Sequence, residues 1–176
     1  MLHSVRDLHS SHSKDSPPHI HAYKAASLNM QKTAAAEEIL NACNDGNFIL
    51  VPLKGIALIE TLYKEIPVRP MTDMDFLAKK EELKGIAAVL GRLGYSCFSS
   101  YRGSYTFSHK KNNIFLDIHT AFVRFPELFR ISDDEISGRL HNHLFNERVQ
   151  VPLLCPEHQL VHIALHLSPG IYSDSG

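Results

Sequence analysis

The sequence contains no tryptophan, only three cysteines and no long uninterrupted hydrophobic stretch. Cys43, Cys97 and Cys155 are odd in number and form no CxxC pair, so they indicate reduced thiols rather than a disulfide framework or a thiolate zinc site. No stretch approaches the roughly 18 apolar residues that a membrane span requires, and the first residues lack the apolar core of a signal peptide. We therefore expect a cytoplasmic protein with no membrane partner.

The chain also lacks an excess of charge of either sign. Eighteen lysines and arginines face nineteen aspartates and glutamates, for a formal net charge of -1, so we expect no duplex DNA partner. The 176 residues, 44% of them hydrophobic, suit one compact domain. Residues 1–24 show no apolar periodicity and are expected to be a flexible tail, with the domain over residues 25–176.

Hydrophobic periodicity and turn residues predict alternating helices and strands. Helices are expected over 28–43, 56–65, 81–93 and 156–167, and in parts of 126–144. Strands are expected over 48–53, 73–78, 95–101, 105–109, 114–120 and 148–153.

Carboxylates interrupt two of the predicted strands. Because strand side chains alternate between faces, Asp73 and Asp75 should point the same way, while Met74 and Phe76 point into the core. Asp117 stands in the middle of another apolar strand, where a charge is costly unless something compensates it. If the two strands are neighbours, three carboxylates meet at one place.

Three close carboxylates need a cation among them, and oxygen ligands of this kind suit Mg²⁺ or Mn²⁺. Two such ions can support an in-line displacement at phosphorus. Lys54-Gly55, at the start of a predicted helix, offers exposed backbone N–H groups and a positive charge for phosphate. Arg69 is either a second phosphate contact or the ionic partner of a nearby aspartate. His119 binds a ligand or has a structural role.

Several motifs occur together in a fixed order along the chain: Leu53-Lys54-Gly55, Arg69-Pro70-Met71-Thr72-Asp73-Met74-Asp75-Phe76-Leu77, Leu93-Gly94-Tyr95, Leu116-Asp117-Ile118-His119 and the late helix from His158 to His166. With these motifs the chain resembles a known family, the uncharacterised bacterial nucleotidyltransferase-like proteins of the polymerase-beta-type nucleotidyltransferase superfamily. This resemblance implies an α+β fold with a small mixed sheet flanked by helices.

The resemblance also implies a reaction and a set of site residues. Such enzymes transfer a nucleoside monophosphate from an NTP to a hydroxyl acceptor and release pyrophosphate, with Asp73, Asp75 and Asp117 as metal ligands. The wider superfamily usually has a Gly-Ser pair where this chain has Lys54-Gly55, so Lys54 is expected to replace the serine at the phosphate. Family members typically continue into a longer helical C-terminal region, and we expect this acceptor-binding part to be truncated here.

Two alternatives stay open at this stage. The first is a catalytically inactive module that binds NTP and Mg²⁺, or a protein partner as in toxin-antitoxin pairs. The second is a transition-metal protein, because His158, His162 and His166 recur every four residues and would share one helix face. The sequence leaves open which NTP is used, whether the acceptor is a protein, an RNA end or a small molecule, and the oligomeric state.

Overall fold

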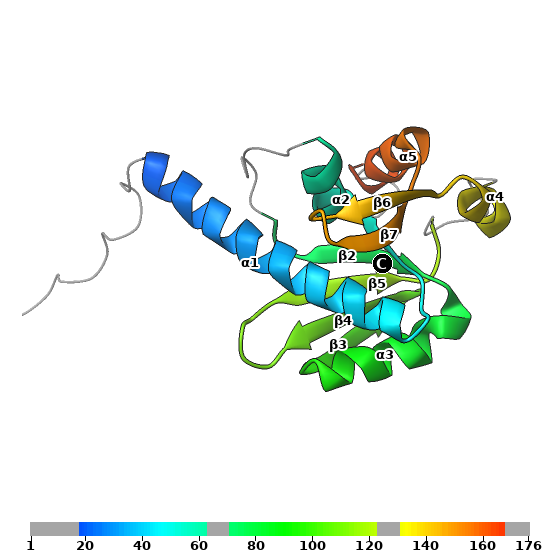
Figure 1. Ribbon diagram of the computed structural model, residues 1–176, viewed down its shortest axis with the longest axis horizontal. Helices are drawn as coiled ribbons and strands as arrows, with labels where there is room; N and C mark the ends of the chain where they lie inside the picture. Colours follow the sequence, from blue (N-terminus) through cyan, green and yellow to red (C-terminus); the bar gives the residue numbers. More distant parts are fainter. Residues whose placement is uncertain (1–17, 63–70, 123–130, 168–176) are drawn as a thin grey trace, which may run out of the picture.

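The computed structural model describes residues 18–62, 71–122 and 131–167 (Figure 1). Along the chain they form α1 (Pro18–Asp45), β1 (Leu50–Leu53), α2 (Lys54–Thr61), β2 (Met74–Ala78), the 3-10 helix η1 (Lys80–Glu82), α3 (Leu83–Arg92), β3 (Tyr95–Tyr101), β4 (Ser104–His109), β5 (Phe115–His119), α4 (Asp133–Gly138), β6 (His141–Phe145), β7 (Val149–Leu153) and α5 (Pro156–Leu167). Among the helices of these residues, none combines the length and the apolar character needed to cross a membrane.

Strands β1 to β5 form one mixed sheet in the order β1-β2-β5-β4-β3, which confirms the predicted small mixed sheet flanked by helices. β2 and β5 are parallel, and the other neighbouring pairs are antiparallel. Parallel strands need a long crossover, and here η1, α3, β3 and β4 supply it. The crossover brings Asp75 opposite Asp117 in the register of the two central strands.

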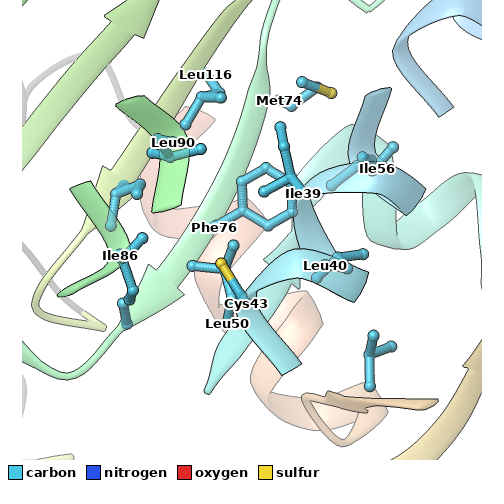
Figure 2. Packing of buried hydrophobic residues seen from close by; sticks show 14 of the residues in the cluster. Ile39, Leu40, Cys43, Leu50, Ile56, Met74, Phe76, Ile86, Leu90 and Leu116 are labelled. Carbon is cyan, nitrogen blue, oxygen red and sulfur yellow. The ribbon is translucent and has the colours of Figure 1, made fainter. Parts of the chain in front are cut away.

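The main core lies on one face of this sheet, under α1 and α3. Figure 2 shows Phe76 of β2 at its centre, with side chains from both helices around it. Burying a side chain of this size contributes roughly 1.5–3 kcal/mol. Residues of this cluster that are at most 2% exposed include Ile39, Leu40, Cys43, Ile56, Met74, Phe76, Ile86, Leu90, Leu116 and Ile118.

A second, smaller cluster covers the opposite face of the sheet near β1. Val51 and Leu53 pack there against Phe122, Ile136 and Leu154. β1 is therefore buried on both faces, as expected for a continuous apolar strand. The polar side chains of β2 and β5 lie on the face opposite the main core.

The first helix begins earlier than expected. α1 begins at Pro18 instead of residue 28, so residues 18–24 are helical. Proline fits the first turn of a helix because its missing N–H has no partner there in any case. Residues 1–17 lie outside the described residues, as do 63–70, 123–130 and 168–176.

The segment 126–144 was expected to be helical in parts, and α4 (Asp133–Gly138) confirms this within its described residues. The strand β6 was not predicted. It begins at His141 and pairs with β7. The turn between them, Asn146 and Glu147, has positive φ at both residues (49° and 60°). Three residues, 146–148, separate the paired Phe145 and Val149. Glycine and asparagine are the usual residues at turn positions with positive φ, so Glu147 gave no turn signal.

Candidate active site

The two central strands align their carboxylates as the alternation predicted. Asp75 of β2 lies opposite Asp117 of β5 in a parallel register. Their neighbours Met74, Phe76 and Leu116 are fully buried on the other face. The hydrophobic side chains therefore hold the strands together and orient the carboxylates away from the main core.

Asp75 is buried and has two cationic or donor partners. Its Oδ1 lies 2.7 Å from Lys54 Nζ and accepts a hydrogen bond from His119 Nε2 at 2.9 Å. Burial alone raises the pKa of the Asp75 carboxyl, but the His119 hydrogen bond and the Lys54 ammonium outweigh it and lower the pKa to about 2. Asp75 is therefore ionised near neutral pH.

Asp117 is short of partners. Its Oδ1 is buried and accepts no hydrogen bond within the described part of the chain. A buried carboxylate oxygen left unpaired is costly, and a cation is the partner that such an oxygen suits best. Ligand atoms of Asp75, Asp117 and His119 all lie within 4.8 Å of one another, a spacing that fits a metal ion.

Asp73 faces the same space without joining this group. It lines the cavity that Asp75 and Asp117 also line. One of its oxygens accepts a hydrogen bond from Thr72 Oγ1 at 2.8 Å. The three predicted carboxylates thus share one cavity, and two of them approach each other together with a histidine.

The cavity has a volume of about 290 Å³ and is lined by residues of the sheet and of α5. Its carboxylates come from β2, from the residue just before it and from β5, while the β3–β4 hairpin supplies a polar wall that includes Tyr101 and Arg102. The guanidinium of Arg102 lies 5.3 Å from the centre of the Tyr101 ring, a cation-π distance. Arg102 was not predicted as a site residue, although the sequence shows a basic residue in an Arg-Gly turn between two predicted strands.

Lys54 lies at the start of α2, and its backbone is unusual. Its φ of 47° is in the left-handed region that favours glycine, at a cost of roughly 1–2 kcal/mol for any other residue. The conformation accompanies the ion pair of its Nζ with Asp75, and Nζ also lies 3.1 Å from His166 Nε2. Lys54 therefore lines the cavity from a strained position, and its contact with phosphate stays a prediction.

Gly55 packs closely against the Met71 side chain. A Cβ atom at Gly55 would lie 3.0 Å from Met71 Cγ, so a larger residue there would require the Met71 side chain to shift. Its predicted contact with phosphate stays a prediction. Arg69, the other predicted phosphate contact, lies outside the described residues.

The segment just before β2 is held by two polar side chains of α1. Asn29 Oδ1 accepts a hydrogen bond from the backbone N–H of Met71 at 2.9 Å. Lys32 Nζ donates to the carbonyl of Met71 and to that of Thr72, the latter at 3.0 Å. Both side chains are buried, and burial lowers the pKa of Lys32 although Asp73 opposes this effect.

Asn29 and Lys32 were not predicted as structural residues, although their spacing in the sequence indicates a buried position. Asn29 and Lys32 fall at helical spacing with the buried residues Ala25 and Ala36. Two polar residues on the buried stripe of a helix need partners, and the backbone before Asp73 supplies them.

The three histidines of α5 do not converge on a metal. Among the described residues, the only group of three or more potential ligands within metal-binding distance is the one around Asp75. His158 packs against Phe122 and lies 3.8 Å from Glu135, whereas His162 and His166 line the cavity. The structure therefore places two of the three beside the carboxylates instead of in a separate zinc site.

His162 has a defined tautomer. A carbonyl oxygen only accepts hydrogen bonds, so the 3.1 Å contact of His162 Nδ1 with the Phe122 carbonyl places the hydrogen on Nδ1. Its buried Nε2 has no hydrogen-bond partner among the described residues. Burial, with help from the positive charge of Lys54 and the nearby His119, lowers the pKa of His162 to about 4. The ring is neutral near pH 7.

Comparison with known proteins identifies the class to which this fold and cavity belong. A family described as uncharacterised nucleotidyltransferases matches residues 8–174. The chain is therefore a member of this nucleotidyltransferase family. A comparison with curated protein sequences gave no significant match.

Solved nucleotidyltransferase structures share the fold. The solution structure of the antibiotic-resistance factor ANT(2'')-Ia aligns over 82% of this chain and 78% of that one, with 16% identity and a TM-score of 0.58. A proposed nucleotidyltransferase from Thermotoga maritima, TM1012, aligns over 78% and 85%, with 10% identity and a TM-score of 0.54.

A crystal structure of ANT(2'')-Ia with adenylyl-2''-tobramycin gives a shorter match. It aligns over 51% of this chain, with 18% identity and a TM-score of 0.45. The chain spans 49% of that structure, about half of its length.

Proposed function

We propose that this chain transfers a nucleoside monophosphate from an NTP to a hydroxyl acceptor and releases pyrophosphate. The observation that carries the proposal is the parallel pairing of β2 and β5. It places the ionised Asp75 beside Asp117, whose buried Oδ1 lacks a hydrogen-bond partner among the described residues. Family membership supports the same class of reaction.

Asp75 and Asp117 would hold Mg²⁺ or Mn²⁺, with Asp73 available to a second ion from the same cavity wall. When bound, such ions neutralise charge on the triphosphate and activate the attacking oxygen. The ligand set fits because Asp75 is already ionised and Asp117 has an unused oxygen.

Two basic side chains of the cavity suit the triphosphate. Lys54 places an ammonium group at the start of α2, and Arg102 places a guanidinium on the β3–β4 hairpin. The positive end of the α2 dipole adds to the attraction for phosphate. Lys54 Nζ also contacts Asp75. Arg69 is proposed as a further phosphate contact.

The proposal is tested by calorimetric titration of ATP, GTP, CTP and UTP into the protein, with and without Mg²⁺ or Mn²⁺. We expect at least one nucleotide to bind in a metal-dependent manner, and we expect Asp75→Asn to abolish this binding. Asp45→Asn is the matched control, because Asp45 is exposed at the end of α1 and outside the cavity. Equal metal-dependent binding by the wild type and Asp75→Asn would refute the site.

Transfer is tested separately from binding. The protein is incubated with the bound NTP and with pools of small hydroxyl compounds, RNA or protein, and pyrophosphate release is measured together with mass gain by the acceptor. A nucleoside monophosphate adduct on one pool establishes transfer and the acceptor class. Binding without pyrophosphate in any pool would favour the inactive NTP-binding module.

A further inference from the structure

The ligand group of the cavity contains a nitrogen donor as well as oxygen donors. Asp117 and His119 are two residues apart on β5, so their side chains lie on the same face of the strand. Asp75 reaches the same point from β2, and the ligand atoms of all three lie within 4.8 Å of one another. In an octahedral site with metal–ligand distances of about 2.1 Å, opposite ligand atoms lie about 4.2 Å apart. One ion can therefore contact all three side chains after they move slightly closer together.

His119 fits this group of ligand atoms better than Asp73 does. Asp73 lines the cavity but does not belong to the group of ligand atoms, and it already accepts a hydrogen bond from Thr72. His119 is positioned by its own contact with the Asp75 oxygen at 2.9 Å, and its side chain is 20% exposed. An ion held by the two facing carboxylates therefore meets an imidazole nitrogen.

The donor type affects which metal binds. Mg²⁺ favours oxygen ligands and gives up water reluctantly, whereas Mn²⁺ accepts both carboxylate and imidazole ligands in six-coordinate geometry. Resting on the metal site of the proposed function, we propose that His119 is a direct metal ligand and that this site selects Mn²⁺ over Mg²⁺.

Metal binding requires two local changes, and the side chains permit both. The ionised Asp75 only accepts hydrogen bonds, so its contact with His119 places a hydrogen on Nε2. Coordination by Nε2 needs the tautomer that carries its hydrogen on Nδ1. Lys54 Nζ must also give up part of its contact with Asp75 Oδ1, which its long flexible side chain allows.

The first test uses Mn²⁺ alone as the probe. Electron spin echo measurements on Mn²⁺ bound to the wild type should show modulation from a directly coordinated nitrogen, and this modulation should disappear in His119→Gln. Glutamine places an oxygen near the position of Nε2, so the variant would offer the ion oxygen ligands in place of the nitrogen. The matched control is His166→Gln, because His166 lines the same cavity but lies outside the ligand group. It should keep the nitrogen signal.

The second test compares affinities by calorimetric titration with Mn²⁺ and with Mg²⁺, each without nucleotide. The wild type should bind Mn²⁺ at least about tenfold more tightly than Mg²⁺, and His119→Gln should lose this ratio, an effect of the size seen when metal-site groups are removed. A general structural defect would weaken both ions equally, so the ratio separates coordination from folding.

The outcomes distinguish the two proposals. Binding of Mn²⁺ without nitrogen modulation, or an unchanged affinity ratio in His119→Gln, would overturn the role of His119 and leave the carboxylate site intact. A nitrogen signal lost in His166→Gln instead would assign the ligand to α5 and also overturn the inference. Failure of the wild type to bind either ion would refute the metal site itself. The echo measurement on the wild type needs no variant, so misfolding of His119→Gln does not prevent the test.

Discussion

Acidification should destabilise this protein through His162, a neutral histidine in the wall of the cavity. His162 is only 8% exposed, and burial together with neighbouring positive charge lowers its pKa to about 4. In the unfolded chain the pKa returns to about 6.5. Between these values the unfolded state binds the proton and the folded state does not. The free energy of unfolding therefore falls as pH drops through this window.

The magnitude follows from the two pKa values. At pH 5 most unfolded chains carry the proton on His162 and most folded ones do not, which lowers the free energy of unfolding by about 2 kcal/mol relative to pH 7. Below pH 4 the full effect is roughly 3 kcal/mol. This is a substantial part of a typical domain stability of about 5–15 kcal/mol.

Chemical denaturation at pH 7 and pH 5 measures this effect, with His162→Gln as the comparison. Glutamine does not titrate, so the loss of stability between the two pH values should be about 2 kcal/mol smaller in the variant. Other histidines contribute equally to both proteins and cancel in the difference. The same pH dependence in both proteins would refute the buried neutral state of His162.

Two further substitutions probe the groups around the carboxylates. In calorimetric titrations without nucleotide, Lys54→Met should bind Mn²⁺ more tightly than the wild type, because no ammonium group then contacts Asp75 Oδ1. The same variant should bind NTP more weakly, because it lacks the proposed phosphate contact. Tighter binding of both Mn²⁺ and NTP would exclude that contact. Asn29→Ala should lower the free energy of unfolding by about 1–3 kcal/mol in denaturant titrations, because the backbone N–H of Met71 loses its buried acceptor. A change near zero would show that this hydrogen bond does not stabilise the fold.

Much of the central sheet was predictable because its signals are local. Alternation around Asp75 and Asp117 correctly separated the core-facing residues from the polar ones, and it required only the period of a strand. The resemblance to nucleotidyltransferases rested on motifs along the chain, and the family match confirms it. The role of each aspartate as a metal ligand stays a prediction.

Features that depend on distant partners were not predicted. The hydrogen bonds from Lys32 to the carbonyls of Met71 and Thr72 join residues about forty positions apart, and no local pattern specifies that pairing. The His119 contact with Asp75 similarly depends on the register of two strands joined by a long crossover. The strand at 148–153 was predicted, but its partner β6 was not, because Glu147 in the turn between them adopts a backbone conformation usually taken by glycine.

A crystal structure with Mn²⁺ and a non-hydrolysable NTP analogue would locate the metal ion through the anomalous signal of manganese. We expect the ion in direct contact with Asp75 and Asp117, and the triphosphate in the same cavity between Lys54 and Arg102. An ion or a triphosphate bound only outside this cavity would refute the proposed active site.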